Sequence, residues 1–251
     1  MKKQELATDI IHYTFPPRAE SVWRTNATVL LKGKKALLLD TGYEFQAKTL
    51  LEDLAGQNIQ VEAVVLTHFH DDHMEGLKLL PGIPVYGSSR FQETLDLWTP
   101  QEDHVYYKPT VAVDAPFSLS FGAHTLTLVP HPGHSACGLL ILINDQFLHV
   151  GDEIIFAADG QNLLPALDGG MDAVKLHLES LHRLRGYEGF AAIIPSHGPV
   201  FAGAELAEAA LNRCVYLQAL LDSKLVISFA DATKDCTCSF MQNGWHESNC
   251  R

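Results

Sequence analysis

Histidine and aspartate residues gather directly after one strongly apolar segment of the chain. Residues 61–66 have the almost continuous apolar character of a buried strand, and the chain then reads Thr-His-Phe-His-Asp-Asp-His. His68 and His70 are two residues apart, so both imidazoles project from one face while the chain is extended. Asp72 and His73 fall where a helix begins and turn toward a neighbouring point. A divalent metal suits this density, because imidazole and carboxylate are its preferred ligands and are costly to bury without partners.

Three further turns each follow an apolar strand and each supply one more candidate ligand. His134 lies in His-Pro-Gly-His-Ser, Asp152 in Gly-Asp-Glu, and His197 in Pro-Ser-His-Gly-Pro. One such turn alone would be a weak signal, but the combination gives five histidines and two aspartates at strand ends. The predicted metal-ligating residues are therefore His68, His70, Asp72, His73, His134, Asp152 and His197.

With these motifs in this order, the chain resembles the metallo-β-lactamase-fold hydrolase superfamily, in its branch of glyoxalase-II-like thioesterases and lactonases. The segment Leu-Leu-Leu-Asp-Thr-Gly at 37–42 also matches the family's first motif, and the resemblance covers about residues 10–222. It implies an α/β fold, a four-layer αβ/βα sandwich of two mixed β-sheets flanked by helices. The site would lie at the sheet edges.

The resemblance also implies a role for each candidate ligand and two divalent metal ions as cofactors. By the family pattern His68, His70 and His134 hold one metal, Asp72, His73 and His197 hold the second, and Asp152 bridges them. Zinc is the first expectation for both, with iron or manganese as alternatives. We assign catalytic roles to Asp72, which would orient the nucleophile, and to Asp40, which would steady the ligand loop. Asp40 can also be read as a turn or capping residue before Gly42.

Charge arithmetic on this site favours hydrolysis. Two divalent ions, two aspartates and a bridging hydroxide leave a charge near +1, which suits an electron-rich carbonyl or phosphoryl oxygen, and metal lowers the pKa of bound water to about 7. We expect hydrolysis of a small ester-like bond, in a thioester, a lactone or a related substrate. The alternatives are a mononuclear iron persulfide dioxygenase on the same fold and a β-lactam or phosphodiester hydrolase. The residue at 70, His rather than Glu, argues against the oxygen-reducing di-iron branch, and Asp152 argues against lactamase branches without a bridging carboxylate.

Composition narrows the partners to small molecules. The 251 residues carry a formal net charge of −12, which disfavours nucleic acid and anionic membrane surfaces. No apolar run reaches the roughly 18 residues of a membrane span, and the first residues lack the apolar region of a secretion signal. Five cysteines, an odd number in a chain of this length, favour a reducing cytoplasm over a disulfide framework. The oligomeric state is left open.

The elements that must position these residues come in two blocks. The first half has strand-like runs at 9–15, 27–31, 36–39 and 61–66, with helices at 43–54 and 71–80. The second has strand-like runs at 111–113, 125–129, 139–143, 147–150 and 191–194, with helices at 171–184 and 204–221. Two blocks of strands with helices after each predict two sheets packed together with helices outside. We expect one domain over residues 1–223 and an appended tail over 224–251.

Several other residues have less specific interpretations. Asp71 is expected to face solvent at the helix start. The segment between Pro81 and Thr110 is rich in aromatic residues, Trp98 among them, which either pack between helix and sheet or line the mouth of the site. Cys236, Cys238, His246 and Cys250 could form a zinc knot, but the one-residue spacing of the first pair favours free thiols.

Overall fold

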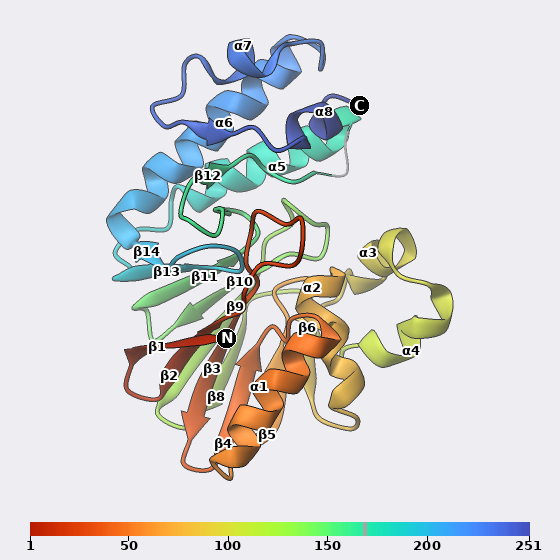
Figure 1. Ribbon diagram of the computed structural model, residues 1–251, viewed down its shortest axis with the longest axis vertical. Coiled ribbons are helices and arrows are strands. Elements are labelled where there is room, and N and C mark those ends of the chain that lie inside the picture. Colours follow the sequence, from red (N-terminus) through yellow and green to blue (C-terminus); the bar gives the residue numbers. More distant parts are fainter. Residues whose placement is uncertain (168–169) are drawn as a thin grey trace.

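Two mixed β-sheets face each other in the computed structural model, which describes residues 1–167 and 170–251 (Figure 1). The first sheet has the strand order β1-β2-β3-β4-β5-β6-β7, antiparallel as far as β4 and parallel beyond it. Its strands are β1 (Lys2–Ala7), β2 (Ile10–Thr14), β3 (Asn26–Lys32), β4 (Lys35–Leu39), β5 (Gln60–Val65), β6 (Val85–Ser88) and β7 (Val111–Val113).

The second sheet has the order β14-β13-β11-β10-β9-β8, with a parallel pairing only between β11 and β13. Its strands are β8 (Phe117–Phe121), β9 (His124–Pro130), β10 (Leu139–Ile143), β11 (Phe147–Gly151), β13 (Ala192–Pro195) and β14 (Phe201–Ala202). A small parallel pair, β12 (Asn162–Leu163) and β15 (Phe240–Met241), lies apart from both.

Helices cover the outer face of each sheet, with α5 and α6 over the second sheet and α1 over the first (Figure 1). The helices are α1 (Glu44–Gly56), α2 (Asp71–Met74), α3 (Phe91–Trp98), α4 (His104–Tyr107), α5 (Gly170–Leu184), α6 (Leu206–Asp222), α7 (Phe229–Thr233) and α8 (Trp245–Asn249). The predicted αβ/βα sandwich is therefore confirmed.

The alternation of side chains along β4 shows how one strand serves two cores. Leu37 and Leu39 are buried in the cluster between the sheets, where they join residues of the second sheet such as Ile141. Leu38, between them in sequence, points to the opposite face and packs with Leu50 of α1. The third cluster lies between the second sheet and α5 and α6. Apolar burial on both faces of a sheet explains why the strands read as continuous apolar runs.

The structure differs from the expected elements in several places, and β1, β6, β8, β12, β14, α3 and α4 were not expected. The helix expected over 71–80 is α only over Asp71–Met74 and continues as a 3₁₀ turn over Glu75–Leu79. Gly76 lies where a Cβ would come 2.4 Å from that of Ala47, so this turn is pressed against α1. Within 224–251 the chain forms α7, β15 and α8, and β15 pairs with β12. Within the described ranges, 1–167 and 170–251, no helix has the length and apolar character to cross a membrane.

Candidate metal centre

The loop after β5 and the start of α2 supply four of the predicted ligands. His68 and His70 lie on the extended part of this loop, and His70 Nδ1 is 3.0 Å from His68 Nε2. Phe69, between them in sequence, is fully buried in the core between the first sheet and α1. This buried ring anchors the loop, so that the two imidazoles on either side of it face the same way.

The loop after β9 brings His134 to the same point. His134 Nε2 is 3.1 Å from His70 Nδ1, and one ligand atom of each of His68, His70 and His134 lies within 4.8 Å of the other two. These three histidines form the first ligand group. His68 and His70 follow a strand of the first sheet, whereas His134 follows a strand of the second.

Asp72, His73 and His197 form the second ligand group, at the start of α2 and after β13. His73 Nε2 is 3.4 Å from Asp72 Oδ1, and His197 Nε2 is 3.2 Å from Asp72 Oδ2. The structure thus brings the predicted residues together, and His68, His73 and Asp152 form a third group that crosses these two.

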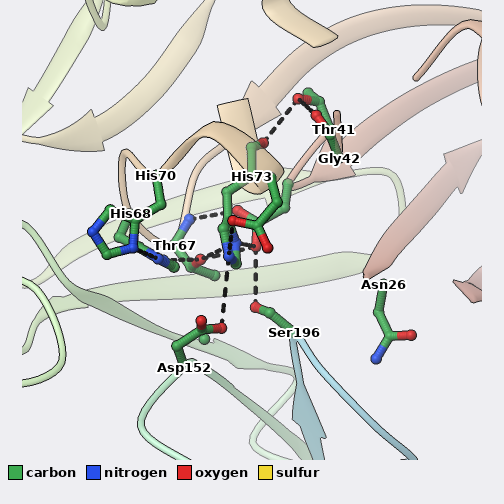
Figure 2. A network of polar contacts seen from close by, with 12 residues as sticks. Asn26, Thr41, Gly42, Thr67, His68, His70, His73, Asp152 and Ser196 are labelled. Carbon is green, nitrogen blue, oxygen red and sulfur yellow. Dashed lines mark hydrogen bonds and ion pairs between the residues drawn. The ribbon is translucent and has the colours of Figure 1, made fainter. Parts of the chain in front are cut away.

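Asp152, at the end of β11, reaches both groups. Its carboxylate lies 3.6 Å from His134 Nε2 of the first group, and 3.6 Å from His73 Nε2 and 3.2 Å from His197 Nε2 of the second. Figure 2 shows Asp152 approaching His73 from the opposite side of the site, together with Ser196. A carboxylate between two sets of nitrogen ligands has the position that a bridging ligand requires.

Asp40 lies behind the ligands and not among them. Its Oδ1 accepts a hydrogen bond from the Thr67 backbone N–H at 2.8 Å, and its Oδ2 accepts bonds from His73 Nδ1 at 2.9 Å and Ser196 Oγ at 3.2 Å. The carboxylate is fully buried and ties the loop after β5 to the loop after β13. Because Asp40 accepts the hydrogen bond from the Nδ1–H of His73, Nε2 is left as the free ligand atom. The backbone carbonyl of Arg24 does the same for His197, whose Nδ1 lies 2.8 Å away.

Glu153 supports the His134 loop, and the sequence interpretation missed it. The His134 backbone N–H donates to Glu153 Oε1 at 3.0 Å, and Ser180 Oγ of α5 donates to Oε2 at 2.5 Å. Burial raises the pKa of Glu153 to about 7. His131 lies on this inner side, 3.9 Å from Oε2, and not at the mouth of the site. The position of Glu153 directly after Asp152 was the available signal in the sequence.

The protonation of the cluster divides along the two groups. Burial, together with the neighbouring imidazoles, lowers the pKa of His68 well below its ordinary value and that of His70 to about 3. Burial also opposes charging of His197, but Asp152 and Asp72 outweigh it and raise the pKa of His197 to about 10. In the first group His68 and His70 are therefore neutral imidazoles, whereas the second group has two carboxylates within reach of two imidazoles.

Some buried nitrogen and oxygen atoms of the site have no hydrogen-bond partner, and such atoms suit a cation. His73 Nε2 and Asp152 Oδ1 are buried and have no hydrogen-bond partner. In the first group, ring nitrogens face one another at 3.0 and 3.1 Å, a spacing at which two lone pairs repel unless a proton or a cation lies between them. Imidazole and carboxylate are ligands of zinc, iron and manganese alike, so the donor set fits divalent metal without selecting the element.

A pocket of about 400 Å³ opens over the ligand cluster, and four aromatic residues contribute to its walls. All three tryptophans of the chain line it, with Tyr43. Trp98 of α3 packs edge-on to His70 with ring centroids 6.0 Å apart and is 57% exposed. Trp23 lies against Trp245 of α8 at 5.0 Å. We call this cavity the aromatic pocket.

Part of the aromatic segment between Pro81 and Thr110 therefore lines the mouth of the site, and part of it packs in the core. Trp98 is in the pocket wall, whereas Tyr107 is buried in the core below the first sheet. Sequence reasoning missed Trp23, Tyr43 and the α8 residues Trp245, Ser248 and Asn249 as pocket residues. The rarity of tryptophan was the only signal, since none of the three lies in a predicted strand or helix.

The remaining candidates belong to none of the ligand groups. Asp71 is exposed at the start of α2, as expected, although it borders the pocket. All five cysteines are free. Cys236 Sγ contacts the Asn212 carbonyl, whereas Cys250 Sγ lies 3.8 Å from His246 Nε2, so the tail thiols are not gathered into one knot. In the part of the chain that the structure describes, the groups able to hold a metal all lie in the ligand cluster.

Comparison with known proteins agrees with the geometry. The model of the metallo-β-lactamase superfamily matches residues 21–198, well over half of the sequence. The chain belongs to the metallo-β-lactamase superfamily. Among curated proteins it is 28% identical to the β-lactamase-like protein 2 homolog of Caenorhabditis elegans over 187 residues, which is 70% of this chain and 56% of that protein. The chain thus spans little more than half of this relative.

Solved structures show the same fold. A metallo-β-lactamase from Pontibacter korlensis superimposes with a TM-score of 0.66 at 20% identity, covering 84% of this chain and 99% of that one. The DIM-1 metallo-β-lactamase does so with a TM-score of 0.63 at 18% identity, covering 84% and 96%. At this level of sequence identity, the structural similarity shows a shared fold and nothing further.

Proposed function

We propose that this superfamily member is a binuclear metal-dependent hydrolase that cleaves a small ester-like bond, in a thioester or a lactone. The position of Asp152 is the observation that carries the proposal, because its carboxylate reaches both ligand groups. In this assignment His68, His70 and His134 hold one divalent ion, Asp72, His73 and His197 hold the other, and Asp152 is shared. Zinc is the first candidate for both.

When bound, the two ions would supply Lewis acidity and a supply of hydroxide near neutral pH, since metal lowers the pKa of water to about 7. The chain's own residues arrange the rest. Asp72 borders the pocket and is placed to accept a hydrogen bond from the attacking water. Asp40 and the Arg24 carbonyl hold His73 and His197 in the tautomer that turns Nε2 to the site.

The aromatic pocket supports an uncharged, partly apolar substrate. Trp23, Trp98 and Trp245 line it, and no lysine or arginine of the described residues does. A substrate with its own carboxylate or phosphate would find no cationic side chain there, whereas an aryl or acyl group would bury apolar surface. Phosphodiesters and RNA are therefore poor candidates. The five free cysteines support a reducing, cytoplasmic setting for this activity.

Metal analysis of the purified, metal-replete chain tests the proposal. We expect two ions per chain, one in His197→Ala, which keeps the first group intact, and one in His134→Ala, which keeps the second. A single ion in the unmodified protein would contradict the binuclear centre. One iron per chain together with oxygen consumption on a persulfide would favour the dioxygenase alternative.

A substrate panel of aryl thioesters, lactones, cephalosporins and phosphodiesters then tests the bond. We expect turnover of thioesters or lactones at least about tenfold above phosphodiesters, because the developing oxyanion of a carbonyl can be stabilised in the site without a cationic side chain. Trp98→Ala should raise KM and leave the metal content unchanged. An unchanged KM would remove Trp98 from the substrate contacts.

A further inference from the structure

A second cavity, of about 350 Å³, lies on the far side of the His197 loop from the aromatic pocket. It lies between the edge strand β1 of the first sheet and the segment that leads into β14, the edge strand of the second. Gly198 and Pro199, which follow the candidate ligand His197, form part of its wall, as does Arg24. None of the residues that line the aromatic pocket lines this one.

Three cationic residues, Lys2, Lys3 and Arg24, line this cavity, in a chain with a net charge of −12. Register explains which lysine faces it. Lys2 pairs with Thr14 and Gln4 with His12 across β1 and β2, so these four share one face, whereas Lys3 pairs with Tyr13 on the other. Lys3 also lines the cavity, but its ammonium forms an ion pair with Asp53 and lies over the Tyr13 ring. Lys2 forms no ion pair with any described residue.

Arg24 supplies the second cation. Its neighbour Trp23 turns to the aromatic pocket, and Arg24 turns to the second cavity. The Nε atom of Arg24 is buried without a hydrogen-bond partner, and no described carboxylate pairs with the guanidinium. A buried donor on a cation without a partner is costly, and an oxyanion that accepts from it would remove the cost.

His12 closes the inner end of the cavity with another unused group. Its side chain is 2% exposed, its Nδ1 lies 3.0 Å from Thr28 Oγ1, and its Nε2 has no partner. Burial and the nearby His149 lower the pKa of His12 to about 3, so the ring is neutral and can donate from Nε2 while Thr28 donates to Nδ1. The one acid that lines the cavity, Asp159, accepts from the backbone and side chain of Gln161 in its own turn.

We infer that this second cavity, the basic pocket, binds a small molecule through an oxyanion group, a phosphate or a carboxylate, held by Arg24, Lys2 and His12. Its volume exceeds that of a bare oxyanion, so there is room for the molecule that carries the group. The Arg24 carbonyl also orients His197, so the basic pocket is one residue away from the candidate metal centre. The inference does not depend on which bond the metal centre cleaves.

Titration of the metal-loaded, ¹⁵N-labelled protein with inorganic phosphate at low ionic strength tests the site, with amide NMR shifts as the readout. Because metal ions also attract oxyanions, the location of the shifts distinguishes binding in the basic pocket from binding at the metal centre. We expect saturable shifts at Gly160 and Val200, which line the basic pocket. Acetate in a parallel titration separates the sources: saturation by both anions indicates a general oxyanion site, and saturation by phosphate alone indicates a phosphate ester.

Variants give the matched comparison. Arg24→Gln should weaken phosphate binding at Gly160 by at least about tenfold, because it removes a charged donor. Lys2→Gln should weaken it severalfold, and its exposed position in the edge strand keeps the test valid if Arg24→Gln does not fold. Lys48→Gln, at an exposed position on α1, should leave it unchanged. Shifts confined to the aromatic pocket, or equal affinities in all three variants, would overturn the inference.

Discussion

At the scale of single residues, the shared carboxylate is the most informative position. Asp152→Asn keeps the shape of the side chain and removes the negative charge that faces both ligand groups. We expect reduced metal retention at both sites and activity lower by about 100-fold or more, since even outer partners of metal ligands are worth 10–100-fold. Elemental analysis and turnover measured on the same preparation give the result.

Asp71→Asn is the matched control for this substitution. It changes a neighbouring acid that is exposed and caps only the backbone N–H of Asp72, at 2.9 Å. Its metal content should equal that of the unmodified protein. Full metal content and full activity in Asp152→Asn would show that the carboxylate is not shared between ions.

Asp40 makes a second prediction at this scale, because it acts through His73. Its φ of +58° is a left-handed conformation that asparagine tolerates, so Asp40→Asn should fold. The amide accepts less strongly from His73 Nδ1 and cannot satisfy every donor that now meets the carboxylate. We expect weaker metal binding in the second group, by about 10-fold, with the first group unaffected. Competition with a graded series of chelators distinguishes the two sites, and equal loss from both would contradict this role.

At the scale of elements, the ligand loops were predictable because each follows a buried strand. Apolar runs such as 61–66 and 147–150 mark β5 and β11, and the polar residues directly after them mark the sheet edge where the ligands meet. Two signals, periodicity and ligand spacing, therefore agreed at the same positions. The assignment of individual ligands to individual ions rests on the family resemblance and stays a prediction.

The elements that the sequence did not reveal are short or irregular. The helix α8 has five residues and β15 has two, too few for any period to be visible. The strand β1 carries mostly exposed, charged residues, because it is an edge strand with one neighbour. Trp245 consequently had no predicted element to place it, although its ring completes the aromatic pocket. Only tertiary packing against Trp23 and α6 positions it.

Arg213 of α6 joins the C-terminal strand β15 and its partner β12 to the sandwich, and it gives a prediction about stability. The fully buried guanidinium donates to the carbonyls of Ile155 and Leu163, at 2.7 and 3.2 Å, and lies over the rings of Phe156 and Phe240. Arg213→Met removes this donor from both buried carbonyls and leaves Ile155 only the longer bond from the Leu163 backbone N–H, at 3.3 Å. We expect the free energy of unfolding to fall by about 2–4 kcal/mol, measured by urea denaturation.

The control for Arg213 is Lys175→Met on α5, where the side chain is exposed. Its effect should stay within about 0.5 kcal/mol. If Arg213→Met is as stable as the unmodified protein, the buried cation does not hold the C-terminal elements β15 and α8 against the sandwich.

At the scale of the whole molecule, the candidate metal centre joins the two sheets. Four of the ligands follow β5 of the first sheet, and the other three follow β9, β11 and β13 of the second: His68, His70, Asp72 and His73, then His134, Asp152 and His197. The alignment of these two edges is a property of the packed sandwich. Short-range sequence signals can therefore identify each loop, but only the fold determines which loops meet.

The many buried histidines predict how this sandwich responds to acid. Burial lowers the pKa of His149 and of His131 to about 4, and burial with His149 nearby lowers that of His12 to about 3. The unfolded chain therefore binds more protons than the folded chain at any pH between these values and about 6.5. Stability should fall as the pH drops through this window, by up to about 1.4 kcal/mol per pH unit for each histidine.

Urea denaturation at pH 7.5 and pH 5.0 checks this expectation, and His12 allows it to be assigned, since it lies outside the ligand cluster. His12→Gln should reduce the stability lost between the two pH values by about 2 kcal/mol, whatever it does to stability at pH 7.5. His182→Gln, at an exposed position on α5, should leave the loss unchanged. Loss of metal at low pH contributes to all three proteins alike, so only a buried neutral imidazole at position 12 makes the first variant differ. An identical loss in His12→Gln and the unmodified protein would mean that His12 gains its proton without opposing the fold.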